Sequence, residues 1–118
     1  MKNILIAEDD PVIVTLLLKR FNDSQHHIHV ATNGQTALQL ALSEEFHLIV
    51  LDLRLPELDG LSILKSIRAQ GLQMPIIAMT GLDDDHNRQK ALLLGVNEYI
   101  TKPFAINHLL TCMHVYMA

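Results

Sequence analysis

The sequence feature that most constrains the fold is a continuous apolar run, residues 48–51, that ends in Asp52. The segments on both sides carry apolar residues at helical spacing, so the run predicts a strand buried on both faces of a parallel sheet. In open α/β sheets, ligands bind beyond the carboxyl ends of the strands. Asp52 therefore stands where a functional site is expected, although an acid here can also simply cap the loop that leads to Pro56.

Strands and helices alternate along the rest of the chain. Four more strands are predicted at residues 2–7, 27–31, 75–79 and 98–101. Helices are predicted between and after them, at residues 11–20, 34–43, 60–69, 83–94 and 105–117. We expect Val12, Leu16 and the neighbouring apolar positions through Leu18 to give the first helix a wide apolar face, and acids at 59 and 83–85 to cap helices. The alternation predicts one doubly wound α/β domain over residues 1–118.

The overall charge and the cysteine content narrow the class of protein. A net charge of −4 argues against nucleic acid or an anionic membrane as a direct partner of this domain. Cys112 is the single cysteine, so no internal disulfide framework is possible and a reducing compartment is indicated. The first apolar run is too short for a signal peptide, and no window is long enough to span a membrane. We expect a cytoplasmic protein.

Polar residues stand at the ends of four predicted strands. They are Glu8 with Asp9, then Asp52, Thr80 and Lys102, and a parallel sheet brings them to one edge. Carboxylates about 4 Å apart repel by roughly 4 kcal/mol at an effective dielectric of 20, so such a cluster requires a cation or a proton. Oxygen ligands of this kind suit Mg²⁺. With an ammonium and a hydroxyl beside them, they indicate a phosphoryl site in which Asp52 is the nucleophile.

These residues lie in segments that together resemble the response-regulator receiver domain of two-component signalling. The segments are Glu8-Asp9, residues 51–60 (LDLRLPELDG), Met79-Thr80-Gly81 and residues 99–104 (YITKPF). The resemblance covers the whole chain. It implies a flavodoxin-like five-stranded parallel sheet in the order 2-1-3-4-5. It also implies a signalling switch that catalyses only its own phosphotransfer and autodephosphorylation, with a sensor histidine kinase or a histidine phosphotransfer protein as partner.

The resemblance also implies roles for individual residues. Asp52 is similar to the phosphoacceptor, and Asp9 and Glu8 are similar to the acidic pair that binds Mg²⁺ directly and through water. The backbone carbonyl of Arg54 resembles a further metal ligand. Thr80 and Lys102 resemble the switch residues that contact the phosphate. Tyr99 resembles the aromatic residue whose rotamer follows Thr80, and Lys102-Pro103 is expected to be a cis peptide.

A switching surface is expected on the helix 83–94, the strand 98–101 and the helix 105–117. Three successive leucines, 92–94, cannot all face the core, so Leu93 is predicted to be exposed. Cys112 and Val115 are surplus to the core stripe of the last helix. With Leu93 and Tyr99 they form a hypothetical apolar face for an output domain or a dimer partner. The sequence does not distinguish a stand-alone regulator from the receiver of a longer protein.

Three other functions fit the sequence less well: a phosphatase, a cofactor binder and a receiver that no longer takes a phosphoryl group. A phosphatase of the haloacid dehalogenase type also uses an Asp after a strand, but it carries a second acid two residues on, where this chain has Arg54. A flavodoxin-like cofactor binder needs a phosphate-cradling first loop, which three acids at 8–10 would oppose. A degenerate receiver that serves only as an interaction module is disfavoured because every site position is filled. His27 and His29 share a strand face, and a solvated edge strand explains them better than a metal site.

Overall fold

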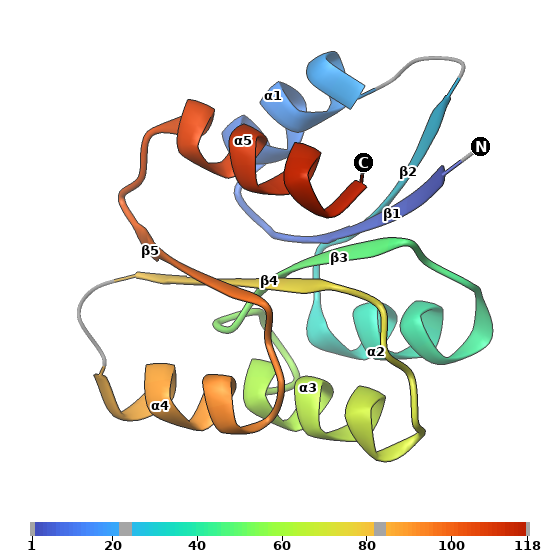
Figure 1. The fold of residues 1–118 in the computed structure, drawn as a ribbon, viewed down its shortest axis with the longest axis vertical. Helices are drawn as coiled ribbons and strands as arrows, with labels where there is room; N and C mark the ends of the chain where they lie inside the picture. The colour runs from blue at the N-terminus through green and yellow to red at the C-terminus, as the bar shows by residue number, and fades with distance from the viewer. Residues whose placement is uncertain (1, 22–24, 82–84, 118) are drawn as a thin grey trace.

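The structure is a computed structural model that describes residues 2–21, 25–81 and 85–117. All five strands are parallel, in the order β2-β1-β3-β4-β5 (Figure 1). The strands are β1 (Lys2–Ala7), β2 (His26–Ala31), β3 (Leu48–Asp52), β4 (Ile76–Gly81) and β5 (Glu98–Lys102). The helices are α1 (Pro11–Phe21), α2 (Gly34–Ser43), α3 (Gly60–Ala69), α4 (Asp85–Leu93) and α5 (Ile106–Met117). The predicted fold class and strand order are confirmed.

The helices cover both faces of the sheet. In Figure 1, α1 and α5 lie on one face, and α2, α3 and α4 lie on the other. Each face has its own buried core, since alternate residues of a strand point in opposite directions. In β3, Ile49 and Leu51 join the core under α2 and α3, whereas Leu48 and Val50 join the core under α1 and α5. Every residue of β3 is buried, as its apolar run predicted.

Element boundaries differ slightly from the prediction. The fourth strand continues through Thr80 to Gly81, and the fifth continues to Lys102, because both residues stay in register with their neighbouring strand. The polar residues at 80 and 102 therefore belong to the strands themselves. Helix α4 ends at Leu93, one residue before the predicted end. The capping predicted for residues 83 and 84 falls outside the described residues.

The apolar face predicted for α1 is only partly right. Val12 is 64% exposed and Leu16 is 38% exposed, whereas Leu17 and Phe21 are buried. The helix places residues four apart on one face, so Leu17 and Phe21 point together into the sheet. Val12 and Leu16 belong to the adjacent stripe, which faces away from that core.

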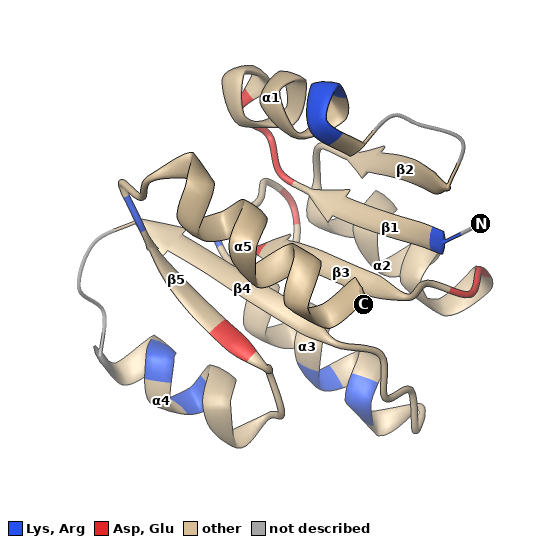
Figure 2. Cartoon of the chain, turned by 45° about the horizontal axis from the view of Figure 1, so that its top comes forward, with Lys and Arg blue, Asp and Glu red and all other residues tan. Residues whose placement is uncertain are grey.

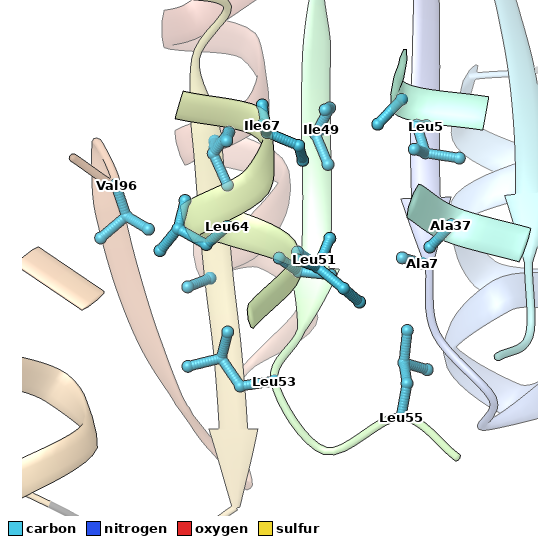
Figure 3. Packing of buried hydrophobic residues seen from close by; sticks show 14 of the residues in the cluster. Leu5, Ala7, Ala37, Ile49, Leu51, Leu53, Leu55, Leu64, Ile67 and Val96 are labelled. Carbon is cyan, nitrogen blue, oxygen red and sulfur yellow. The ribbon is translucent and has the colours of Figure 1, made fainter. Parts of the chain in front are cut away.

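Two close backbone approaches hold the loop that follows β3. A Cβ on Gly60 would lie 2.4 Å from Leu53 Cα, and one on Gly34 would lie 2.5 Å from the carbonyl oxygen of Leu58. Both positions therefore require glycine. The side chain of Asp59 caps α3 by accepting from the Leu61 amide, as predicted. Figure 3 shows Leu53 continuing the buried row beyond the end of β3, so the loop carrying Asp52 is anchored to the core.

The outer strand β2 carries the two histidines predicted to share a face. The rings of His27 and His29 stack with their centroids 4.5 Å apart, and His29 Nδ1 lies 3.5 Å from Glu44 Oε2. Strand β2 is at an edge of the sheet, as the solvated-strand interpretation expected. Among the described residues, no helix combines the length and apolarity needed to cross a membrane.

Candidate functional site

The acids of the predicted site come from the ends of two neighbouring strands. Glu8 directly follows β1 and Asp52 ends β3, and these strands pair with Ala7 beside Leu51. Carboxylate oxygens of Glu8, Asp9 and Asp52 all lie within 4.8 Å of one another. Glu8 and Asp52 are buried and Asp9 is exposed. We call these three residues the acidic cluster; it is open to solvent on the side of Asp9.

Lys102 reaches the acidic cluster from the far edge of the sheet. Its Nζ lies 2.6 Å from Glu8 Oε1 and donates to Asp52 Oδ2 at 3.0 Å. It is followed by a cis peptide bond to Pro103, as predicted. One ammonium thus contacts both buried carboxylates, which makes it the cation of the site in this structure.

The two buried carboxylates are also held by backbone amides. Glu8 Oε2 accepts from the amides of Asp9 and Asp10 at 2.9 and 3.1 Å. Asp52 Oδ1 accepts from the amide of Arg54 at 2.9 Å. Charge-assisted bonds of this kind fix the orientation of both side chains. The side chain of Arg54 is exposed.

Burial and pairing shift the protonation of the site in opposite ways. Burial raises the pKa of Glu8 from 4.5 to about 7; hydrogen bonds from Lys102 and the Asp10 amide oppose the rise, and Asp52 adds to it. For Lys102, burial acts to lower the pKa, but the contacts with Glu8 and Asp52 outweigh it and raise the pKa above 10.5. The ammonium therefore stays charged, while the cluster holds more negative charge than one ammonium can balance.

Thr80 lies on β4, the strand next to Asp52, and Tyr99 lies on β5, one strand further. Thr80 follows Met79, which pairs with Asp52 across β3 and β4. The Thr80 side chain is buried, and its hydroxyl has no hydrogen-bond partner among the described residues. An unsatisfied buried hydroxyl costs about 1–3 kcal/mol, so this group is available to a ligand at the strand ends. Tyr99 is half-buried on β5, and the Arg88 guanidinium lies 5.8 Å from its ring centroid.

The predicted apolar surface is only partly formed as expected. Leu93 is 88% exposed and Val115 is 65% exposed, which confirms that neither belongs to the core. Cys112 differs, because it is half-buried and packs against the core under α1 and α5. Leu93 lines a groove that α4 forms with α3.

A second surface beside the site was missed in the sequence. A groove of about 480 Å³ lies between α1 and the segment that joins β5 to α5. Its lining is mostly apolar and includes Lys102: Asp10, Ile13, Leu16, Gly81, Lys102, Pro103, Phe104 and Ile106. Val12 extends the same exposed stripe of α1. The only sequence signal was the second apolar stripe on α1, which looks the same as a core stripe before the helix is docked.

The acidic cluster fits a magnesium ion. Its donors are carboxylate oxygens, which hard divalent cations prefer, and one of its three residues is exposed and open to solvent. Two carboxylates packed against one ammonium leave a negative charge that a divalent cation would balance. Among the described residues, no other group of three ligand-type side chains is close enough to hold a metal ion.

Comparison with known proteins agrees with this geometry. The family model for the response regulator receiver domain matches residues 4–114. Over 104 residues the chain is 40% identical to the alkaline phosphatase synthesis transcriptional regulatory protein PhoP of Bacillus subtilis, covering 88% of this chain and 43% of PhoP. The chain thus spans less than half the length of this relative.

Two solved structures extend the comparison. One is the receiver domain of the sensor histidine kinase PA1611 from Pseudomonas aeruginosa, which has a magnesium ion coordinated in its active site cleft. It matches this chain with a TM-score of 0.82 and 32% sequence identity, and the match covers 98% of this chain and 96% of that one. The receiver domain of Ssk1 from Saccharomyces cerevisiae, crystallised with the histidine phosphotransfer protein Ypd1, has a TM-score of 0.84 and 30% identity, with coverages of 98% and 88%. By its sequence, fold and strand-end residues, this chain belongs to the response regulator receiver domain family.

Proposed function

We propose that this receiver domain accepts a phosphoryl group onto the carboxylate of Asp52 from a phosphohistidine of a sensor kinase or phosphotransfer protein. In that transfer the bond from phosphorus to the imidazole nitrogen breaks and a bond from phosphorus to the Asp52 oxygen forms. The observation that carries the proposal is the convergence on Asp52. The ammonium of the half-buried Lys102 contacts its carboxylate, and an unpaired buried hydroxyl lies on the next strand at the same edge.

Glu8, Asp9 and Asp52 would hold Mg²⁺, and the carbonyl oxygen of Arg54 stays a predicted further ligand. The ion would neutralise charge on the phosphoryl oxygens. The protein's own contribution is orientation: backbone amides fix the carboxylates of Glu8 and Asp52 before any ligand arrives. Lys102 supplies a charged donor that can move from the carboxylates to a phosphoryl oxygen.

The switching role rests on Thr80 of β4 and on Tyr99 of the neighbouring strand β5. A phosphoryl group adds about −1.5 to −2 charges and three acceptors, so it offers the Thr80 hydroxyl the partner that it lacks. Movement of Thr80 would free space beside β5, where Tyr99 packs against the core under α2 and α3. We propose that Tyr99 follows, and that the surface of α4, β5 and α5 changes with it.

The phosphohistidine partner would dock on the groove between α1 and the segment after β5. Leu16 and Phe104 line this groove together with Lys102, so a partner seated there brings its phosphohistidine to the acidic cluster. The exposed Val12 extends the apolar contact. A partner of this kind was crystallised with the similar receiver domain of Ssk1.

We infer a switch that is loaded and unloaded, and not an enzyme that turns over external substrates. A haloacid dehalogenase mechanism needs a general acid two residues after the nucleophile. Here that residue is Arg54, whose side chain is exposed. An output domain beyond this chain and a cytoplasmic location stay predictions.

The deciding experiment follows the intact mass of the protein with acetyl phosphate, with and without Mg²⁺. We expect a Mg²⁺-dependent adduct of one phosphoryl group that is absent in Asp52→Asn. Asp59→Asn is the matched control, because Asp59 is an exposed acid in the same loop and should leave loading unchanged. An adduct that survives in Asp52→Asn, or that forms equally in EDTA, would contradict the proposal.

A further inference from the structure

A groove between α3 and α4 is not used by the phosphoryl site. It has a volume of about 420 Å³ and lies where the two helices run side by side on one face of the sheet (Figure 1). Its lining comes entirely from α3 and its cap and from the end of α4: Asp59, Leu61, Ser62, Lys65, Lys90, Leu93 and Leu94. We call it the α3–α4 groove.

The middle of the α3–α4 groove is apolar. Leu61 and Leu94 are half-buried and pack against the core beneath. Leu93 stands over them and is 88% exposed, the highest value among the large hydrophobic residues that the structure describes. An exposed leucine beside two partly buried ones forms an apolar contact surface that a second molecule can cover.

The rim of the α3–α4 groove is basic, although the chain as a whole carries a charge of −4. Lys65 on α3 and Lys90 on α4 are both exposed. Figure 2 shows basic positions on both helices, whose sequences also contain Arg68 and Arg88. The acid in the lining, Asp59, is the cap of α3 and accepts from the Leu61 amide. The two lysines of the lining thus outnumber its single acid.

We propose that the α3–α4 groove docks an acidic amphipathic helix of another protein. An apolar side chain of that helix would pack against Leu61, Leu93 and Leu94. Acidic side chains one turn to either side would reach Lys65 and Lys90. The interaction goes beyond phosphoryl transfer and does not require it, because no residue of the acidic cluster lines the groove.

The charges argue against two other occupants. Among the described helices of a second copy, α1, α2, α3 and α5 contain no Asp or Glu and α4 contains only Asp85, so none of them offers a row of acids. A nucleic acid backbone would suit the lysines but would leave Leu93 uncovered, and Leu93 is the most exposed group of the groove. An acidic helix matches both the apolar middle and the basic rim.

The test uses two synthetic amphipathic peptides, one with Leu and Glu and one with Gln at every Glu position, titrated into the ¹⁵N-labelled chain. We expect saturable amide shifts on α3 and α4 with the Glu peptide, and at least fivefold weaker binding of the Gln peptide. Lys65→Glu combined with Lys90→Glu should weaken Glu-peptide binding at least tenfold, and Leu93→Ser at least fivefold. Loading of Asp52 by acetyl phosphate, followed in parallel, should be unchanged in these variants.

Matched controls lie on other faces of the domain. Lys19→Glu replaces an exposed lysine of α1, and Val115→Ser replaces an exposed apolar residue of α5, so both should bind the Glu peptide like the unaltered chain. The proposal is overturned if no shifts appear at roughly 1 mM peptide, if both peptides bind equally, or if the controls weaken binding as much as the groove variants. It is also overturned if a short DNA duplex shifts the groove amides more strongly, or if the groove variants abolish self-association of the chain.

Discussion

Glu8→Gln gives a quantitative test of the electrostatics of the acidic cluster. Burial raises the pKa of Glu8 to about 7 in the metal-free protein, against 4.5 when unfolded. The folded state therefore binds the proton more tightly, and ionisation of Glu8 destabilises the fold. Below pH 4.5 the group is protonated in both states and has no effect. Between pH 4.5 and 7 its contribution to the free energy of unfolding falls by about 1.4 kcal/mol for each pH unit, and above pH 7 the loss is complete.

The expected size of the effect follows from that window. Glutamine resembles the protonated acid and can still accept from Lys102, so Glu8→Gln should match the unaltered chain near pH 4.5. At pH 8 in EDTA it should be more stable by about 2–3 kcal/mol. With saturating Mg²⁺ the difference should shrink or change sign, because the unaltered chain gains a cation that the variant holds less well.

Urea unfolding at pH 5, 6, 7 and 8, followed by circular dichroism, measures this difference directly. Titrations of groups that do not interact with Glu8 are shared by the two proteins and cancel in the comparison. Glu45→Gln serves as the control, since Glu45 is exposed and distant from the acidic cluster, and its difference should stay near zero. A Glu8→Gln difference that does not vary with pH, or that favours the unaltered chain at pH 8 in EDTA, would refute the reasoning.

Three further predictions concern the frame around the site. Gly60→Ala should lower the free energy of unfolding by at least about 2 kcal/mol, because its Cβ would lie 2.4 Å from Leu53 Cα. The Cβ of Gly81→Ala meets no atom within 4 Å, so this control should change the free energy of unfolding far less. Urea unfolding compares the two variants. Arg68→Met should cost about 1–3 kcal/mol in the same assay, because its guanidinium donates to the carbonyl oxygens of Leu72, Met74 and Gly95, which would lose these partners. Burial and the nearby Glu98 raise the pKa of the Cys112 thiol. Alkylation by iodoacetamide should therefore be slower at pH 8 than for a free cysteine, and its rate should still increase above pH 9. A rate that levels off below pH 9 would contradict this prediction.

The acidic cluster could be predicted from sequence because a simple rule governs it. Parallel strands end at one edge, so identifying the strands was enough to bring Glu8, Asp52 and Lys102 together. The exposure of Leu93 was predictable for a similar reason, since three successive helical residues cannot share one face. Both predictions depend only on local periodicity and on the direction of the strands.

What the sequence did not reveal depends on how helices dock. Helix α1 carries two apolar stripes, and its sequence does not say which one meets the sheet, so the predicted apolar face included the exposed Val12 and Leu16 as well as the buried Leu17. Cys112 was similarly placed outside a core that it partly joins. The α3–α4 groove arises only when residues some thirty positions apart become neighbours. Such surfaces are set by tertiary packing and leave no periodic signal.

The tight loop after Asp52 gives a physical reason why the phosphoryl site and the α3–α4 groove should influence each other. Asp52 is followed by Leu53, and Leu53 touches Gly60 at the start of α3 so closely that no Cβ fits between them. On the next strand, Thr80 is followed by Gly81, the end of β4, and the chain then leads to α4. A ligand that draws Thr80 toward Asp52 therefore acts at the beginning of the segment that leads to α4, while α3 is held against the core. Such a ligand would change the spacing of Lys65 and Lys90 across the groove. The affinity for an acidic helix should therefore differ between the domain with phosphorylated Asp52 and the unphosphorylated domain, even though no groove residue contacts the phosphoryl group.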